Sequence, residues 1–366
     1  MPFDRWNALN DVPVFPAERF GAVADRLGKI LATRNDILLF QTEAVVALEA
    51  VAASLARPGL KAINIVTSPF GAWTGGWLRR GGAEVVTLTA EPARPIGIAA
   101  VTAAFDAHPD VKAVFLCHAE SANGVLNPLE EIVAAARARG IVTVVDAVAS
   151  VGGHPLAVDA LGVDIAVIGP QKSLAGPAGV SAVSVSPAAW ALIGREGGPR
   201  DSSLSLLDRK AWLDAGRGAL PGTSAQLEFF ALEAALDRVE AEGLDAILAR
   251  HATAARATRA GLLALGAEPS AEAGRASHLV TTTCLPEGVD MEAFLAAAAP
   301  LDTDFSAGVG PGAERLVRLN HTGRRARFET VLSGVVGYGI ALGKVGQTAD
   351  VAAAAAAVAA HYRADV

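Results

Sequence analysis

The amino-acid sequence predicts an α/β fold: a mostly parallel sheet of seven strands covered by helices, followed by a smaller α+β domain. Between about residues 36 and 186, short β-branched runs alternate with longer stretches of helical spacing. The runs are apolar on both faces, which is typical of parallel strands buried on both sides. After about residue 240 this alternation ends and helical patterns dominate. We therefore expect a large domain over residues 1–242 and a small one over 243–366.

The predicted strands of the large domain are the runs at 36–41, 62–68, 85–90, 113–119, 141–147, 165–170 and 180–186. Between them, stretches such as 129–140 place alanine, leucine and charged residues at helical spacing. Ligands of parallel sheets bind at the carboxyl ends of the strands. Polar side chains stand at five of these predicted ends: Gln41, Ser68, His118, Asp146 and Lys172.

In the small domain the sequence predicts a long helix over 243–266, a strand within 276–286 and a helix over 290–299. The segments "TDFSAG" and "RLVRLNHTG" follow, and helical patterns continue from 325 to the end. A short N-terminal segment, residues 1–15, precedes the predicted helix "AERFGAVADRLGKIL". We see no internal repeat and no long flexible linker.

Composition and charge exclude several classes of function. A net charge of −7 without clustered cations argues against a nucleic-acid surface. The N-terminus lacks the pattern of a signal peptide, and the alanine run at 350–362 is too short to span a bilayer. Cys117 and Cys284 stand in apolar runs without the spacing of a metal site, so we expect buried free thiols. These features predict a cytoplasmic protein that acts on small molecules and binds no membrane.

Lys172 stands out in "VIGPQKSLAGPAG", at the end of a predicted buried strand. The chain has six lysines and 25 arginines, so a retained lysine points to chemistry that arginine lacks. A primary amine can lose its proton and attack a carbonyl group. Asp146 ends the preceding predicted strand, and an aldehyde cofactor needs both groups: an amine for the imine and a carboxylate for the pyridine nitrogen. An ordinary Asp–Lys ion pair is the alternative, and spacing alone favours it.

The surrounding sequence is more specific. The segments "HAESANGVLNPLEEI" and "VVDAVASVGGHPLAVDALGVDIAVIGPQKSLAGPAGVS" resemble the class V, fold-type I pyridoxal-phosphate-dependent aminotransferases, in particular the alanine–glyoxylate and serine–pyruvate group. Within that family the resemblance is strongest to its pyridoxamine–pyruvate branch. It runs without a gap from His118 to about Ser186, and more loosely from residue 36 to the end. The resemblance implies a fold-type I transaminase that moves an amino group between a small amino donor and a 2-oxo acid such as pyruvate or glyoxylate.

The family's cofactor residues transfer onto matching positions of this sequence. By that resemblance, Lys172 is the lysine that forms the Schiff base and Asp146 the partner of the pyridine nitrogen. Val148 packs under the ring, Ser121 donates a hydrogen bond near its phenolic oxygen, and Gln171 contacts the phosphate end of pyridoxal 5′-phosphate.

Three further residues are assigned in the same way. Phe70 falls where the family stacks an aromatic side chain on the cofactor, although a core phenylalanine is an equal alternative. Thr223 resembles the threonine that reaches the phosphate from the neighbouring subunit, which implies a homodimer with shared active sites. Arg318 resembles the arginine that binds the substrate carboxylate in a bidentate manner, with a solvent-facing strand arginine as the alternative.

The sequence departs from the family at the corner that binds the phosphate. There the residues are Glu43, Ala44 and Val45, at the start of a helix whose N–H groups face the anion in the family. A glutamate should repel a phosphate. The pyridoxamine–pyruvate branch, which uses the unphosphorylated vitamer as a substrate, also has an acidic residue at this position. Alternatively, Glu43 turns outward as an acid at a helix start.

Two other departures bear on the substrate. Val309 stands where the pyridoxamine–pyruvate branch has a second arginine, and the family's N-terminal glycine-proline loop is missing. On balance the sequence favours a transaminase with phosphorylated cofactor, with the free-vitamer enzyme as the nearest alternative. A fold-type I lyase of the desulfurase kind and a non-catalytic protein of this fold are the remaining alternatives. Against the lyase, Cys284 lies in a strand pattern and not in a mobile loop.

Overall fold

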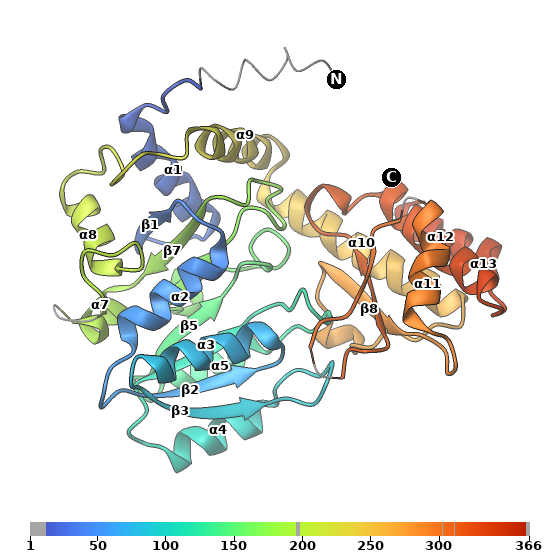
Figure 1. Cartoon of the computed structure of the whole chain (residues 1–366), viewed down its shortest axis with the longest axis horizontal. Helices are drawn as coiled ribbons and strands as arrows, with labels where there is room; N and C mark the ends of the chain where they lie inside the picture. The colour runs from blue at the N-terminus through green and yellow to red at the C-terminus, as the bar shows by residue number, and fades with distance from the viewer. Residues whose placement is uncertain (1–11, 195–197, 302, 311, 364–366) are drawn as a thin grey trace.

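A computed structural model of the chain describes residues 12–194, 198–301, 303–310 and 312–363 (Figure 1). Most of the predicted N-terminal segment 1–15 therefore lies outside the described residues. The described chain forms a large part built on a seven-stranded sheet and a small C-terminal part built on a three-stranded sheet.

The large sheet has the strand order β1-β7-β6-β5-β4-β2-β3. Strands β3, β2, β4, β5 and β6 pair in parallel, while β7 is antiparallel to both of its neighbours. All seven predicted strands are confirmed, and so is the mostly parallel arrangement. Their bounds are β1 Asp36–Phe40, β2 Lys61–Val66, β3 Glu84–Thr89, β4 Ala113–Cys117, β5 Val142–Asp146, β6 Ile165–Ile168 and β7 Ser181–Val185.

Helices cover both faces of this sheet because its strands are apolar on both sides. In β1, Ile37 and Leu39 belong to one hydrophobic core, while Leu38 and Phe40 belong to the other. The first core is closed by α1 Ala17–Ile30, α4 Ile98–Ala107, α5 Leu129–Arg137, α6 Val158–Leu161 and α9 Gln226–Glu242. The second is closed by α2 Ala44–Leu55, α3 Pro69–Arg80, α7 Pro187–Ile193 and α8 Leu206–Asp214.

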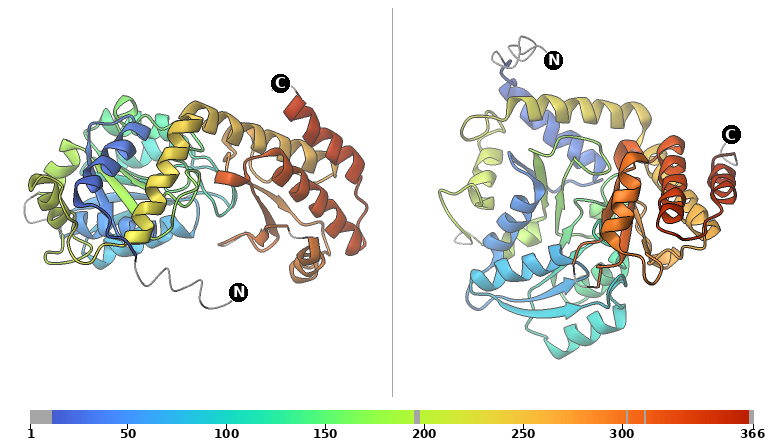
Figure 2. Two further views of the ribbon diagram at one scale, coloured as in Figure 1. Left: turned by 90° about the horizontal axis from the view of Figure 1, so that it is seen from above. Right: turned by 45° about the vertical axis from the view of Figure 1, so that its right-hand side comes forward.

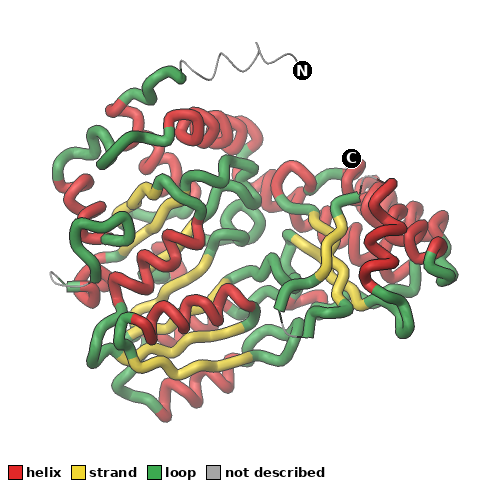
Figure 3. Tube along the Cα trace, in the orientation of Figure 1, coloured by secondary structure: helices red, strands yellow, loops and turns green. Residues whose placement is uncertain are grey.

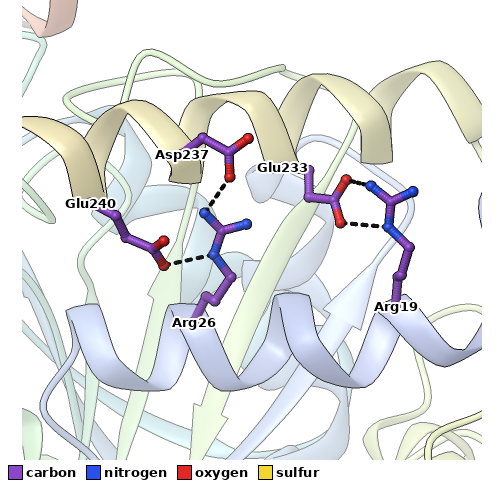
Figure 4. A network of polar contacts seen from close by, with 5 residues as sticks. All are labelled: Arg19, Arg26, Glu233, Asp237 and Glu240. Atoms are coloured by element: carbon purple, nitrogen blue, oxygen red, sulfur yellow. Dashed lines mark hydrogen bonds and ion pairs between the residues drawn. The ribbon is translucent and has the colours of Figure 1, made fainter.

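Ion pairs align α9 with α1 on the outside of the first core, and the helices lie side by side in two views (Figures 1 and 2). Arg19 pairs with Glu233, and Arg26 pairs with Asp237 and Glu240 at 2.7 Å each (Figure 4). Residues seven apart share one helix face, so each helix presents one charged stripe to the other. This pairing sets the direction in which α9 leads toward the small part.

The small part is an antiparallel sheet with the order β8-β10-β9 (Figure 3). Helices pack around it and confirm the predicted succession of elements. The bounds are α10 Leu244–Ala264, β8 Val280–Cys284, α11 Met291–Ala298, β9 Phe305–Ala307, β10 Leu316–Asn320, α12 Phe328–Lys344 and α13 Val351–Arg363, with single 3₁₀ turns at Ala273–Arg275, Ala299–Leu301 and Gly323–Arg325. Gly243, with φ +84°, separates α9 from α10, where we predict the domain boundary.

The two cysteines differ in their surroundings. Cys117 is buried as predicted, whereas Cys284 is exposed, so the expectation of a buried thiol there is wrong. Cys284 is the last residue of β8. The four residues before it are buried, and it alone in the strand is exposed. Across the described residues, no helix is both long and apolar enough to cross a membrane.

The small part packs closely against the end of the large sheet. The ring of His154, from the loop after β5, stacks on the ring of His278 at a centroid distance of 4.2 Å. The backbone N–H of His278 also donates to His154 Nε2 over 2.9 Å. Burial lowers the pKa of His154 well below its usual value, so the stacked ring is neutral at neutral pH. Nearby, Gly323 has φ +62°, and a Cβ there would lie 2.7 Å from the Lys172 carbonyl oxygen.

Candidate active site

The structure places Asp146 and Lys172 at the same edge of the large sheet. Asp146 is the last residue of β5 and is paired with Val167 of β6, and Lys172 follows four residues after the end of β6. Lys172 lines a cavity of about 480 Å³ between the two parts of the chain, together with Ser121, Gln171 and Arg318. Parallel neighbours end side by side, which explains why two residues distant in sequence meet here.

Asp146 is a carboxylic acid whose pKa is strongly shifted in the structure. Its Oδ1 accepts a hydrogen bond from the Val148 N–H over 3.0 Å. Burial is the main cause that raises the pKa of Asp146 to about 7; Glu120 and Glu43 act in the same direction, while the Val148 hydrogen bond and Lys172 act against it. Burial disfavours the charged carboxylate, so a cation placed against it would stabilise it. A protonated ring nitrogen is such a cation, so the residue fits its predicted partner.

Side chains near Asp146 pack closely against Gly169. A Cβ at Gly169 would lie 2.5 Å from Gln171 Oε1 and 2.8 Å from Val148 Cγ1, so both side chains fold over this glycine. Val148 is partly exposed and packs on the core of the second sheet face. An apolar side chain next to an acid at a sheet edge suits a planar aromatic ring. The group formed by Asp146, Val148 and Lys172 is called the ring end below; of these three residues, Lys172 lines the cavity.

The residues Thr42, Glu43 and Gln171 form a second group, which we call the cup end; of these, Gln171 lines the cavity, and Glu43 caps helix α2. Its carboxylate accepts a hydrogen bond from the Val45 N–H at 2.7 Å and from Gln171 Nε2 at 2.8 Å. Helix α2 itself begins at Ala44. Glu43 is exposed and caps the helix start, so the predicted alternative of an outward-facing acid at a helix start stays open. The carboxylate occupies donors that the resemblance assigned to a phosphate.

Two polar atoms at the cup end have no hydrogen-bond partner among the described residues. They are Thr42 Oγ1 and Gln171 Oε1, and both atoms are buried. A buried polar atom without a partner costs free energy, so a bound group that supplies a hydrogen bond is favoured here.

Arg318, the residue predicted to bind the substrate carboxylate, lines one side of the cavity. Its Nε donates to Ser306 Oγ over 3.0 Å, and its Nη1 donates to the Ser121 carbonyl oxygen over 3.1 Å. Burial lowers the pKa of Arg318, while the nearby Asp304 opposes that shift. The side chain lines the cavity, so the alternative of a solvent-facing strand arginine is wrong. A half-buried guanidinium held in place by two hydrogen bonds is suited to bind a substrate carboxylate.

Of the predicted site residues, Ser121, Gln171, Lys172 and Arg318 line this cavity, whereas the others lie outside its lining: Glu43, Ala44, Val45, Phe70, Asp146, Val148 and Thr223. Phe70 is the second residue of α3, and its ring packs edge-on against Trp73 at 5.4 Å. Thr223 is exposed in a loop held by Gln41, whose Oε1 accepts from the Ala225 N–H over 2.6 Å. The role predicted for Thr223 is in a neighbouring subunit's site, and its exposure is compatible with that role.

Comparison with known proteins adds the family. The model of the family described as aminotransferase class-V matches residues 20–297, which include Glu43, Asp146 and Lys172. The chain belongs to the class V aminotransferases. It is therefore a transaminase with the fold-type I architecture, in a family whose members depend on pyridoxal phosphate.

Three relatives of this aminotransferase are informative. A pyridoxamine–pyruvate transaminase from Mesorhizobium japonicum is 33% identical over 329 residues, 89% of this chain and 83% of the relative. A crystal structure of the pyridoxamine–pyruvate aminotransferase from Mesorhizobium loti superposes with a TM-score of 0.92 at 30% identity, covering 100% of this chain and 95% of that one. An alanine–glyoxylate aminotransferase from Drosophila melanogaster is 31% identical and covers 78% of this chain and 73% of its own.

The sequence analysis of this aminotransferase missed several residues that line the cavity. Asp304, Asn320 and Arg325 all border it. Asn320 had a detectable signal, because it is two residues from Arg318 in a predicted strand and so shares its face. Arg325 belongs to the basic segment "RRAR", which reads as solvated charge, and Asp304 depends on a strand pairing that sequence spacing does not reveal.

A buried polar network under Ser121 was also missed. Glu120 is fully buried and accepts a hydrogen bond from Thr67 Oγ1 over 2.6 Å. Asn127 Nδ2 donates to the same hydroxyl at 2.9 Å, and Asn123 Nδ2 donates to the Thr67 carbonyl oxygen at 2.8 Å. The network fixes the loop that brings Ser121 to the cavity.

Proposed function

We propose that this aminotransferase uses the unphosphorylated vitamer as a substrate, with pyridoxamine as the amino donor and pyruvate as the acceptor. The observation that carries the proposal is the position of Glu43. Its carboxylate takes the Val45 N–H and the Gln171 amide at the start of α2. In the reaction the amino group leaves C4′ of pyridoxamine and is bound to C2 of pyruvate, giving pyridoxal and alanine.

Charge favours the free vitamer at this end. A phosphate group brings nearly two negative charges to a site where a carboxylate already neutralises the helix N-terminus. Two unit charges about 4 Å apart repel by roughly 4 kcal/mol at the effective dielectric of a protein surface. A hydroxymethyl group brings no charge and so avoids this repulsion.

Hydrogen bonding favours the same conclusion. A hydroxymethyl group has one donor and two acceptor positions, and the cup end offers a matching set. The unpartnered Gln171 Oε1 accepts, the unpartnered Thr42 hydroxyl donates or accepts, and the Glu43 carboxylate accepts. A phosphate has only acceptors at neutral pH and would leave Gln171 Oε1 unsatisfied.

The ring end supplies the groups that transamination requires. When bound, the pyridine ring acts as an electron sink that stabilises negative charge on the carbon losing a proton. Asp146 holds a proton on the ring nitrogen, since its own carboxyl group needs a cationic partner. Lys172 Nζ carries the proton between C4′ of the vitamer and C2 of the acid. Arg318 binds the carboxylate of the acid and orients C2 toward Lys172.

The relatives support the acceptor as well as the donor. The two proteins from Mesorhizobium are named for pyridoxamine and pyruvate, and the Drosophila relative is named for alanine and glyoxylate. All three names describe amino transfer to or from a small 2-oxo acid.

A transaminase that retains pyridoxal 5′-phosphate is the second candidate, favoured by Val309. By the resemblance, the pyridoxamine–pyruvate branch has a second arginine at this position, whereas this chain has an exposed valine. Lys172, Asp146, Val148 and Arg318 would serve this reaction in the same roles.

Titration of the apo-protein with pyridoxal and with pyridoxal phosphate separates the two candidates. We expect tighter binding of pyridoxal by the native protein, and a reversal of the preference in Glu43→Ser. Formation of pyridoxal and alanine from pyridoxamine and pyruvate, followed by absorbance and chromatography, tests turnover. Tighter binding of the phosphate form that Glu43→Ser leaves unaltered would establish the second candidate.

We also propose a cytoplasmic homodimer. The exposed Thr223 and the half-exposed Leu227 lie near the carboxyl end of β1, next to the cup end. A neighbouring subunit would cover this surface and bring its own Thr223 to the site. Sedimentation velocity tests the dimer. Two free cysteines, Cys117 and Cys284, support a reducing compartment such as the cytoplasm.

A further inference from the structure

Another cavity of the protein, of about 300 Å³, lies next to the loop that carries Lys172. Its walls come from residues 173–175, the end of α9, the start of α10 and the segment 324–327. Its charged lining residues are four arginines and one acid: Arg238, Arg250, Arg324, Arg327 and Glu242. We propose that this cavity is a binding site for a small phosphate-bearing anion. The proposal does not depend on the proposed function, because it involves neither the pyridine ring nor the 2-oxo acid.

The charges around this cavity are not balanced by the chain itself. Glu242 pairs with Arg250, so the other three arginines remain as net positive charge. Arg238 donates a hydrogen bond to the Ala175 carbonyl oxygen over 2.9 Å. The side chains of Arg324 and Arg327 have no polar partner among the described residues. Three cations around one small space repel one another, so an anion among them lowers the free energy.

Acids that are close in sequence do not supply this missing charge. Asp237 and Glu240 flank Arg238 on α9, but both pair with Arg26 of α1 (Figure 4). Glu329, which follows Arg327 closely, borders a different cavity. The positive charge is therefore local, in a chain whose net charge is −7. A long polyanion such as a nucleic acid would extend from this cavity onto a protein that is negative overall, which favours a small anion.

The arrangement of the arginines suits a phosphate group. A guanidinium offers a planar pair of N–H donors that matches two phosphate oxygens, and a phosphate carries nearly two negative charges at neutral pH. Arg238 is held by its bond to Ala175, and Arg250 is held by Glu242 and by the Gly323 carbonyl oxygen. Three of the four arginines, all but Arg250, are exposed, so an anion reaches them from solvent without a movement of the chain.

An anion bound here would join the two parts of the chain. Arg238 belongs to the large part, whereas Arg324 and Arg327 belong to the small part. The same small part approaches the loop of Lys172 closely, because a Cβ at Gly323 would lie 2.7 Å from the Lys172 carbonyl oxygen. Binding therefore holds the small part against this loop, and we expect it to stabilise the folded protein as the anion concentration rises.

Calorimetric titration of the apo-protein with inorganic phosphate, in a phosphate-free buffer of low ionic strength, tests the site. We expect saturable binding by the native protein, weakened by added sodium chloride. In the double variant Arg324→Gln, Arg327→Gln, we expect the affinity to fall by about tenfold or more, because two bidentate partners are lost. Arg238→Gln, from the other part of the chain, should weaken phosphate as well. Malonate, which spreads the same charge over two groups, should bind the native protein more weakly.

A matched control removes two arginines elsewhere on the surface. The double variant Arg34→Gln, Arg80→Gln loses the same charge from side chains that are 96% and 74% exposed, and it should keep native affinity for phosphate. Arg318→Ala should also keep it, because Arg318 lines the active-site cavity and not this one. Thermal melting without phosphate checks that every variant folds, and phosphate should raise the melting temperature of the native protein and of the control double variant.

Four results would overturn the proposal. One is the absence of saturable phosphate binding by the native protein. Another is an equal loss of affinity in the control double variant, which would assign the effect to overall charge. A third is a loss in Arg318→Ala with native affinity in the Arg324→Gln, Arg327→Gln protein, which would place the phosphate in the active-site cavity. The fourth is malonate binding as tight as that of phosphate, which would make the cavity a site for dicarboxylic acids.

Discussion

The ring end and the cup end lie at the same edge of the large sheet, but their carboxyl groups are satisfied differently. At the ring end, burial raises the pKa of Asp146 to about 7, and the group is best stabilised by an incoming cation. At the cup end, Glu43 is bonded to the chain itself, through the Val45 N–H and the Gln171 amide. The ring end therefore keeps the chemistry of the family, while the cup end changes which molecule is recognised.

Removing Lys172 should have the largest effect, because the ring end then loses the group that moves the proton. We expect Lys172→Ala to lower kcat by about four orders of magnitude. Lys210→Ala, on the outer helix α8, is the matched control and should keep native kcat. Borohydride reduction in the presence of pyridoxal, followed by peptide mapping, should place the pyridoxyl group on Lys172. Label on another lysine, with normal turnover by Lys172→Ala, would end this assignment.

The second prediction concerns the pH dependence of stability at the ring end. In the folded protein the pKa of Asp146 lies at about 7, above its ordinary value of 3.8. The folded state therefore binds the proton more tightly, and stability from this group falls as pH rises from about 4 to about 7. We expect the free energy of unfolding of the apo-protein to fall by up to about 4 kcal/mol over that range, at about 1.4 kcal/mol per pKa unit.

Asp146→Asn removes this titration. Urea unfolding of the apo-protein at several pH values should show a flatter profile for the variant than for the native protein. If the free energy of unfolding depended on pH equally in both proteins, the Asp146 carboxylate would already be stabilised by groups of the chain. The contrast between the ring end and the cup end would then be wrong.

Arg318 serves neither end of the site alone, and its loss should weaken binding of the acid. We expect Arg318→Ala to lower kcat/KM for pyruvate by about 2–4 kcal/mol of transition-state stabilisation. Arg318→Lys should recover little, because an ammonium group cannot make the same planar pair of hydrogen bonds. Steady-state kinetics measure both variants, and an unchanged kcat/KM in Arg318→Ala would contradict the role.

Glu43→Gln tests charge at the cup end without a large change of shape. The amide keeps an oxygen for the Val45 N–H but removes the negative charge. We expect pyridoxal phosphate to bind more tightly by about 1–3 kcal/mol, less at high salt, while pyridoxal changes little. Fluorescence titration at two ionic strengths measures both ligands. Equal gains for the two ligands would show that charge at residue 43 does not select between them.

Thr42→Val should have the smallest effect of the series. The hydroxyl oxygen has no partner among the described residues, so its removal should not destabilise the fold. If the vitamer's hydroxymethyl group is bound there, pyridoxamine should lose about 1 kcal/mol of binding energy. Calorimetric titration measures the loss, and thermal melting is the control. Native affinity in Thr42→Val would remove this hydroxyl from the binding site.

The strands and the ring end were predictable because they follow from local patterns. Seven apolar runs predicted seven strands; Asp146 lies at the end of one of them, and Lys172 follows the next run after a short turn. Parallel neighbours end at the same edge, so no further information was needed to bring these residues together.

Other parts of the site depend on contacts that a single sequence does not contain. Glu43 at a helix start is compatible with several side-chain positions, and its hydrogen bonds to the Val45 N–H and to Gln171 depend on a residue 128 positions away in the sequence. Arg325 belongs to a basic segment typical of a solvated surface, and only the pairing of β9 with β10 brings Asp304 within its reach. Cys284 stands in an apolar run, yet it is the last residue of β8 and is exposed, unlike the four residues before it.

The stacked pair of His154 and His278 gives the protein its own spectroscopic reporter. Each imidazole lies 4.2 Å from the other, with 22° between the ring planes, so the protons of one ring feel the ring current of its neighbour. The chain has seven histidines, and their proton resonances form a spectrum small enough to assign by single substitutions. One ring belongs to the large part and the other to the small part. A movement of the small part on substrate binding changes their separation, and it would be recorded as a chemical-shift change without any attached label.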